Sequence, residues 1–318
     1  VLWVWFDALI NYVAGTMREK AESSQDAIPN FDDLKQAPLF KKLWEPDASG
    51  KNAVCHLIGK DILWHHTVIW WAMLMGAGIT PPSKVFAHGW WTVEGDKMSK
   101  TLGNVIKPAE VAAKYGRDAL RYFILTEGPA KNDADWRQER FLQRFNGELA
   151  GELGNLFSRV LGMNEKYFGT EVPHHPDYEV QHPLISEMTT ILTSLAPKLR
   201  ASMTNVDVTA ALDAIWAVVR RANKIIEETQ PFKLAKDPTQ KGLLATVMNV
   251  ELQALRSLAH ALTPFLPESA AKMKTQLGIT DEKPESLEAA CAWRDSFSGT
   301  RVHKGDNLFP RIEAEKKA

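Results

Sequence analysis

The chain has 318 residues, 45% hydrophobic and 24% charged, which is typical of a globular protein with two or three domains. Its 38 Lys and Arg residues nearly balance 39 Asp and Glu, which excludes a uniformly polycationic nucleic-acid binder. Two distant cysteines exclude a disulfide framework and suit a reducing cytoplasm, and no stretch approaches the ~20 apolar residues of a membrane span. We therefore expect a cytoplasmic protein without a membrane partner.

The first 95 residues alternate between apolar strand-like and helix-like segments. Buried strands are predicted over 1–6, 53–58 and 84–88, and helices over 8–22 and 62–76. Because the chain opens directly on an apolar strand pattern, we expect native residues to precede it. Short helical pieces are expected around 34–43. This alternation favours parallel strands with crossover helices, and ligands of such sheets bind at the carboxyl ends of the strands.

After Pro108 the sequence pattern becomes helical. Helices are predicted over 109–125 and 136–168, the second with a basic face of Arg137, Arg140 and Arg144. Beyond a linker, three apolar stripes at helical spacing predict an antiparallel bundle, over 184–199, 208–219 and 244–262. The short apolar segment 308–312 is expected to dock back onto the body.

The strongest chemical signal is the string GDKMSKTLGN at residues 95–104. Lys97 and Lys100 lie three apart, with Ser99 between them and glycines at both sides. Two cations on such a loop can close on a phosphate chain as negative charge develops. For an arbitrary K-x-x-K string a solvated surface loop would be the better interpretation, but the longer string is far rarer.

The end of the second predicted strand carries Gly59 and Asp61 at the start of a helix. Backbone N–H groups there favour an anionic or hydroxyl-rich ligand. Asp61 is suited to ribose hydroxyls, or it simply caps the helix; both interpretations stay open. The histidines nearby lack the spacing of a metal site, so we predict no metal ligands and no zinc site in this chain.

Two further sites have plain structural alternatives. Asn155 and Arg159 are four apart on one helix face, where they could read a base edge or form a solvated surface pair. Phe232 follows a proline at a helix start, where it could stack on a base or belong to the bundle core.

Taken together, the chain resembles the methionyl-tRNA synthetases, a class I aminoacyl-tRNA synthetase family. The lysine string is similar to the family's KMSKS signature, with Thr101 in place of the last serine. The other strings that carry the resemblance are VWFDALINYV (4–13), LIGKDILWHHTVIWWAMLMGAG (57–78), FAHGWWTVEGDKMSKTLGN (86–104), ELGNLFSRVL (152–161) and LFPRI (308–312).

The resemblance implies a fold that is α/β plus all-α. It places the second half of a Rossmann-type catalytic domain at 1–95, the lysine loop and a stem-contact region at 96–150, and a helical anticodon-binding bundle at 151–318. The family's first signature, HIGH, is absent. The resemblance therefore implies the C-terminal part of a synthetase, which needs its N-terminal half as a partner. We expect a monomer.

The resemblance also implies roles for individual residues. The catalytic residues would be Lys97, Ser99 and Lys100. The methionine side chain would be bound by Trp5, Ala8, Leu9, Tyr12, Ile62 and His66. ATP, with Mg²⁺, would be bound by Gly59, Asp61, His88, Gly89, Trp91 and Lys100. The CAU anticodon of tRNA(Met) would be read by Asn155, Arg159 and Phe232.

Two positions depart from the family pattern. Phe232 stands where tryptophan is frequent, which keeps the stacking face and loses the indole N–H. Leu9 replaces a proline of some relatives. Two other functions remain open: a tRNA anticodon-binding module without catalysis, and a class I synthetase for another amino acid such as cysteine or leucine.

Overall fold

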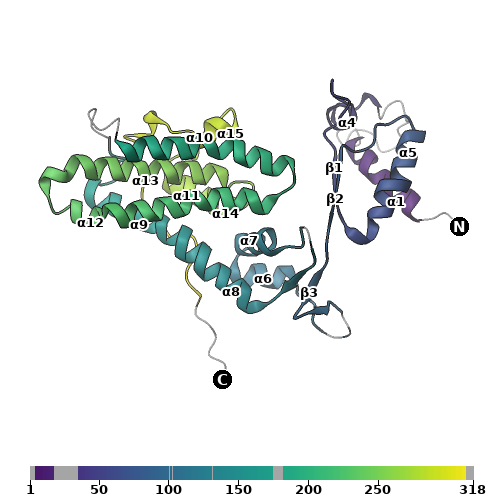
Figure 1. The fold of residues 1–318 in the computed structure, drawn as a ribbon, viewed down its shortest axis with the longest axis horizontal. Coiled ribbons are helices and arrows are strands. Elements are labelled where there is room, and N and C mark those ends of the chain that lie inside the picture. Colours follow the sequence, from purple (N-terminus) through teal and green to yellow (C-terminus); the bar gives the residue numbers. More distant parts are fainter. Residues whose placement is uncertain are drawn as a thin grey trace, which may run out of the picture. The chain divides into compact units, whose positions relative to one another are not determined.

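The computed structural model describes residues 4–17, 35–99, 101, 103–130, 132–174 and 182–312. The chain divides into two compact units, which are described separately (Figure 1). The first unit is Val1–Trp91 with Pro129–Ala134, and the second is Thr92–Gly128 with Asp135–Ala318. The division into three parts at residues 95 and 150 stays a prediction.

The chain is helical where the sequence pattern predicted its first strand. Helix α1 spans Val4–Ala14, and a 3₁₀ turn, Gly15–Met17, follows it. Trp5, Leu9 and Val13 are spaced four residues apart, which places them on one helix face, and the last two are buried. The prediction of a strand over 1–6 is therefore wrong for residues 4–6, because the spacing of the buried residues outweighs the strand propensity of Val and Trp. Residues 1–3 and 18–22 lie outside the described ranges.

The first unit has a small hydrophobic core formed by three helices. Helix α4 spans Pro38–Trp44, in the region where short helical pieces were expected, and α5 spans Trp70–Gly76. Together with α1 they bury Leu9, Val13, Ala37, Phe40, Trp44, Trp70, Leu74 and Ile79.

Strand β1, Cys55–Gly59, pairs in parallel with β2, Lys84–His88, so the second and third predicted strands are confirmed. Gly59 lies opposite His88 in the register. The helix predicted over 62–76 is a continuous helical stretch, which begins with a 3₁₀ turn, Lys60–Ile62, includes a π turn, His65–Ile69, and ends with α5. The Trp70 N–H bonds to the His65 carbonyl, which is the five-residue spacing of a π turn, and the ring of His66 bonds to the carbonyl of Ile62.

A small sheet opens the second unit. Its order is β4-β3-β5, formed by Asp96–Lys97, Trp91–Val93 and Ala134–Trp136. Strands β3 and β4 are antiparallel and joined by Glu94 and Gly95, both with positive φ (52° and 88°). A two-residue turn of this kind matches the twist of a hairpin. The sequence pattern predicted neither β4 nor β5.

The helices that follow are more divided than predicted. Helices α6, Pro108–Tyr115, and α7, Arg117–Glu127, are separated by Gly116, whose φ of 93° no α-helix accommodates. The predicted helix over 136–168 is a continuous helical stretch from residue 138 onward. Its parts are α8 (Gln138–Arg144), a π-helical segment (Phe145–Gly154) and α9 (Asn155–Phe168).

The predicted helix bundle is confirmed. Its helices are α10 (Pro183–Thr204), α11 (Val208–Thr229), α12 (Pro231–Leu234), α13 (Lys241–Ala261), α14 (Pro267–Gln276) and α15 (Leu287–Cys291). Helix α13 is central, because every residue from Leu244 to Ala261 is buried. None of the helices that the structure describes has the length and apolarity needed to cross a membrane.

The C-terminal segment docks onto the body as predicted. Leu308 and Phe309 are buried. The side-chain amide of Asn146 donates to the Ile312 carbonyl, and its oxygen accepts from the Ile312 N–H, both at 2.9 Å. The ring of Phe309 meets that of Phe145 edge-on, with centroids 6.0 Å apart.

Candidate functional sites

Four of the predicted methionine-site residues lie together in the first unit. The Tyr12 hydroxyl is 3.0 Å from Nε2 of His66, and Nδ1 of His66 is 2.9 Å from the Ile62 carbonyl oxygen. Since a carbonyl only accepts, Nδ1 carries the proton and Nε2 accepts from the Tyr12 hydroxyl. Burial raises the pKa of Tyr12, which keeps the hydroxyl protonated. The ring of Trp5 lies edge-on to His66, with centroids 6.3 Å apart.

The other two predicted residues of this site lie differently. Leu9 is only 1% exposed and belongs to the hydrophobic core. Ala8 is exposed on α1. Their contact with a methionine side chain stays a prediction.

His56 belongs to the same aromatic cluster, although no role was predicted for it. Its ring centroid is 4.2 Å from that of Tyr12, and its Nε2 accepts from the indole N–H of Trp70 at 3.1 Å. Burial lowers the pKa of His56 to about 4. A neutral His56 therefore contacts Tyr12 through packing and not through charge.

The predicted ATP residues Gly59, Asp61 and His88 converge at the carboxyl ends of β1 and β2. A Cβ built on Gly59 would lie 2.6 Å from a carboxylate oxygen of Asp61 and 4.0 Å from Cε1 of His88. Any side chain at position 59 would thus displace the Asp61 carboxylate. This is the sheet edge at which ligands of parallel α/β folds bind.

The neighbouring turn is fixed by a residue that the sequence did not indicate, Asp133. A Cβ on Gly89 would lie 2.6 Å from its carboxylate, which also accepts from the Trp90 N–H at 2.8 Å and from Lys60 Nζ at 2.6 Å. Lys60 lies over the Trp90 ring, 4.6 Å from its centroid. The Lys60 ammonium and the Trp90 N–H lower the pKa of Asp133. Asp133 therefore holds the chain at Gly89, next to Trp91, which is half-buried on β3.

In the second unit the lysine loop follows directly from the β3–β4 hairpin. Lys97 ends β4 and is exposed, and Ser99 is half-buried. Asn104 closes the loop, because its oxygen accepts from the Ser99 N–H at 2.8 Å and its amide donates to the Lys97 carbonyl at 3.2 Å. Lys100 lies outside the described residues.

Asp135 anchors the hairpin turn beneath this loop. One of its oxygens accepts from the Gly95 N–H and from the Thr92 hydroxyl, both at 2.8 Å, and the other accepts from Arg137 at 2.7 Å. These bonds, Arg137 first, lower the pKa of Asp135 to about 2. The Arg137 guanidinium is thus paired with the carboxylate that holds the hairpin turn.

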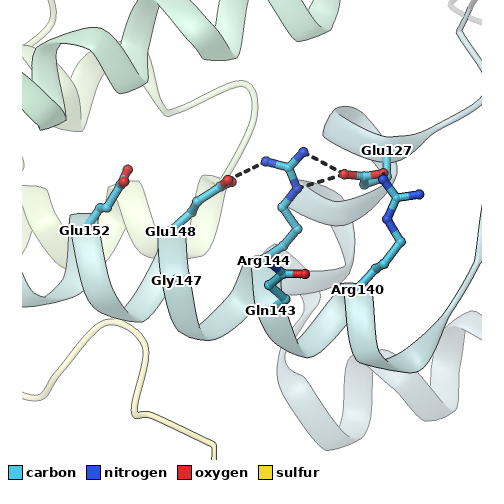
Figure 2. Close-up of a pocket in the computed structure, with 7 residues that line it drawn as sticks. All are labelled: Glu127, Arg140, Gln143, Arg144, Gly147, Glu148 and Glu152. Carbon is cyan, nitrogen blue, oxygen red and sulfur yellow. Dashed lines mark hydrogen bonds and ion pairs between the residues drawn. The ribbon is translucent and has the colours of Figure 1, made fainter.

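The predicted basic face of Arg140 and Arg144 is neutralised. Figure 2 shows these residues around a pocket of about 420 Å³, with the Arg144 guanidinium between Glu127 and Glu148. Arg140 also pairs with Glu127, at 3.0 Å. Because both guanidinium groups already have carboxylate partners, this pocket lacks the uncompensated positive charge of an anion site.

The predicted anticodon residues are accessible at the bundle. Asn155 begins α9 and is exposed, and Arg159 is half-buried one turn later. Phe232 is 48% exposed on α12, so the alternative that it belongs to the bundle core is excluded. Asn155 also lines a pocket of about 470 Å³ against the C-terminal segment.

Metal ligands are not grouped in the described ranges: none of the His, Cys, Asp and Glu side chains there form a set of three or more that could hold an ion.

Two family profiles together match most of the chain. One, described as tRNA synthetases class I (M), matches residues 1–161, and one described as the anticodon binding domain of methionyl tRNA ligase matches residues 172–318. A methionine–tRNA ligase of Caldanaerobacter subterraneus subsp. tengcongensis is 40% identical over the whole chain, and that of Bacillus subtilis is 36% identical. The chain spans 46% and 44% of these two proteins, which is less than half of their length.

The chain is also similar to solved structures of methionyl-tRNA synthetases. A Mycobacterium tuberculosis methionyl-tRNA synthetase bound by methionyl-adenylate matches with a TM-score of 0.81 at 32% identity, over 98% of this chain and 56% of that one. The apo form of that synthetase matches with a TM-score of 0.79 at 30% identity, over 99% of this chain and 57% of that one.

Proposed function

Since the chain belongs to the class I methionyl-tRNA synthetases, we propose that it takes part in the activation of L-methionine by ATP and its transfer to tRNA(Met). The main support for this proposal is that Gly59, Asp61 and His88 lie close together at the ends of two parallel strands. A nucleotide in this position is what the edge of such a sheet accommodates. The adenylate held by the M. tuberculosis relative supports the same chemistry.

In the proposed reaction, the methionine carboxylate attacks the α-phosphorus of ATP and pyrophosphate leaves. Asp61 holds the ribose hydroxyls, while Gly89 and Trp91 flank the adenosine through their backbone. Negative charge develops on the phosphates during the attack. Lys97 and Lys100 stabilise that charge, and Mg²⁺ accompanies the ATP. Ser99 helps to fix the loop through its N–H bond to Asn104.

The methionine side chain is bound beside Tyr12 and His66. Their fixed hydrogen bond presents a neutral, mostly apolar wall, since His66 has both ring nitrogens occupied. Trp5 adds an aromatic face, which suits a polarisable thioether. A hydroxyl at the 3′ end of tRNA(Met) then attacks the carbonyl of methionyl-adenylate, which forms the methionyl ester and releases AMP.

The bundle is proposed to recognise the anticodon. Arg159 is half-buried on α9, where its charge, with that of Arg221, partly offsets the desolvation that raises the pKa of the buried Glu251, and its guanidinium is suited to a base or a phosphate. Phe232, exposed at the start of α12, offers its ring for stacking.

A second candidate function is anticodon binding without catalysis. It is favoured by Arg159 and Phe232 and requires nothing from the first unit.

Charging of tRNA(Met) with labelled methionine separates the two. We expect no charging by residues 1–318 alone, and charging once the chain is joined to the N-terminal half of the catalytic domain. Binding of tRNA(Met) without charging by the joined protein would favour the second candidate.

A further inference from the structure

The C-terminal strap, residues 304–312, runs antiparallel to the helical stretch 145–168. Three contacts define the direction. A Cβ on Gly162 would lie 3.5 Å from Lys304 Nζ, and a Cβ on Gly154 would lie 3.7 Å from the Phe309 carbonyl oxygen. Asn146 holds the backbone of Ile312 by two hydrogen bonds. In Figure 1 the yellow C-terminal segment descends beside α9.

The strap is long enough to follow the helix between these contacts. From Asn146 to Gly162 the helix rises about 24 Å, at about 1.5 Å per residue. From Lys304 to Ile312 an extended chain covers about 26 Å, at about 3.3 Å per residue. The strap therefore follows the helix from Gly162 to Asn146, with bends at Asp306, Leu308 and Phe309.

Gly154 keeps the strap against the helix. A Cβ there would lie 3.0 Å from the Leu149 carbonyl oxygen and 3.8 Å from Cβ of Phe309. A larger side chain would push Phe309, which is 8% exposed, out of its place. The strap is therefore packed as part of the second unit.

Beside Gly154 the strap and the helix line an open pocket of about 470 Å³. Its helix wall carries the Asn155 amide and the Ser158 hydroxyl, and its strap wall carries Asn307 and Arg311. Both strap residues are exposed. Amides and hydroxyls suit the edge of a base, and a guanidinium at the rim suits a phosphate. The volume lies within the range of pockets that hold one nucleotide-sized ligand.

We propose that this pocket binds one nucleotide of the tRNA anticodon loop and that Asn307 and Arg311 of the strap are contact residues for it. The inference rests on the proposed function, because it takes Asn155 as a residue that reaches the anticodon. It adds a second wall, contributed by a segment about 150 residues away in the sequence from Asn155. Unstacked loop nucleotides are the form in which RNA sequence is read, and a polar pocket of this kind accepts one.

Titration of the 318-residue chain with an anticodon stem–loop RNA carrying CAU tests this inference. Asn307→Ala is expected to weaken binding about 5-fold, as for one neutral hydrogen bond, and Arg311→Ala about 10-fold or more, as for a charged one. Lys304→Ala is the matched control, since Lys304 is an exposed cation of the same strap that does not line the pocket. It is expected to change binding less than 2-fold. Unchanged thermal midpoints show that each variant keeps its fold.

A double-mutant cycle locates the contact. If Asn155 and Asn307 hold the same nucleotide, the loss in the variant with both replaced by alanine is smaller than the product of the two single losses. Asn307→Ala and Arg311→Ala that bind like Lys304→Ala, while Arg159→Ala binds more weakly, overturn the inference and leave the proposed function standing. A wild-type chain with no preference for CAU over an altered anticodon overturns both.

Discussion

The Tyr12 hydroxyl lies 3.0 Å from Nε2 of His66, which joins helix α1 to the π turn that follows β1. The bond holds one histidine tautomer, because Nδ1 of the same ring donates to the Ile62 carbonyl. Two segments separated by 54 residues are thereby fixed at the wall of the proposed methionine site.

Replacing Tyr12 with phenylalanine removes this bond and little else. The loss of one neutral hydrogen bond, with Nε2 of the buried His66 left unpaired, predicts a rise of about 5-fold or more in the KM for methionine. The measurement is ATP–pyrophosphate exchange by the chain joined to its N-terminal half. Tyr115→Phe is the control, since the Tyr115 hydroxyl accepts from Gln138 on the second unit. Equal effects of the two substitutions would argue against a role for Tyr12 in binding methionine.

A substitution in the lysine loop is expected to have a kinetic effect different from that of Tyr12→Phe. Lys100→Ala should lower the rate of adenylate formation by roughly 100-fold or more, as for the loss of one preorganised charge donor in the transition state. Single-turnover formation of methionyl-adenylate measures it. Lys107→Ala is the control, because Lys107 is an exposed lysine paired with Glu110 close by in the sequence. A Lys100→Ala enzyme that keeps its rate and loses only affinity for ATP would contradict the assigned role.

Arg159→Ala should reduce tRNA charging more than it reduces exchange. The guanidinium is proposed to contact the anticodon, and its charge also acts on the buried Glu251, so thermal unfolding of the variant checks that the fold is kept. We expect charging at limiting tRNA to fall about 10-fold or more. Lys166→Ala, on the same helix α9, removes one charge without touching the proposed site. Equal losses in charging and exchange would mark Arg159 as structural.

His56 makes the stability of the first unit depend on pH. Its pKa is about 4 in the folded chain, below the ordinary value of 6.5, so the unfolded chain binds the proton first as the pH falls. The stabilisation is complete above pH 6.5 and is lost progressively between 6.5 and 4. The slope is at most about 1.4 kcal/mol per pH unit for one proton.

Thermal unfolding between pH 7 and pH 4 tests this dependence. His56→Gln keeps an acceptor for the Trp70 indole and removes the titrating ring. The variant is expected to lose less stability on acidification than the wild type does. A variant with the same acid sensitivity as the wild type would show that another group is responsible.

The sequence predicted what local patterns determine. Strand β2 was predicted at its observed bounds because a short apolar run lies between turn residues. The bundle helices were predicted because their apolar stripes have the helical period. The docking of Leu308 and Phe309 followed from an apolar run in a polar context.

What the sequence did not predict depends on contacts between distant residues. The Asp133 carboxylate contacts Gly89 and Lys60, and the side-chain amide of Asn146 bonds to Ile312. Because these partners are far away in the sequence, no local pattern indicates the role of Asp133 or Asn146. The first strand was predicted wrongly because Val and Trp favour strands locally. The helix forms there because Leu9 and Val13 pack into a core whose other members come from residues 37–79.

The central claim is that the first unit belongs to a catalytic site for methionine activation. Methionine-dependent ATP–pyrophosphate exchange tests it most directly, with leucine and cysteine as competing substrates. We predict exchange with methionine by the chain joined to its N-terminal half, and none by residues 1–318 alone. Exchange that stays absent in the joined protein, or that responds best to leucine or cysteine, would contradict the account.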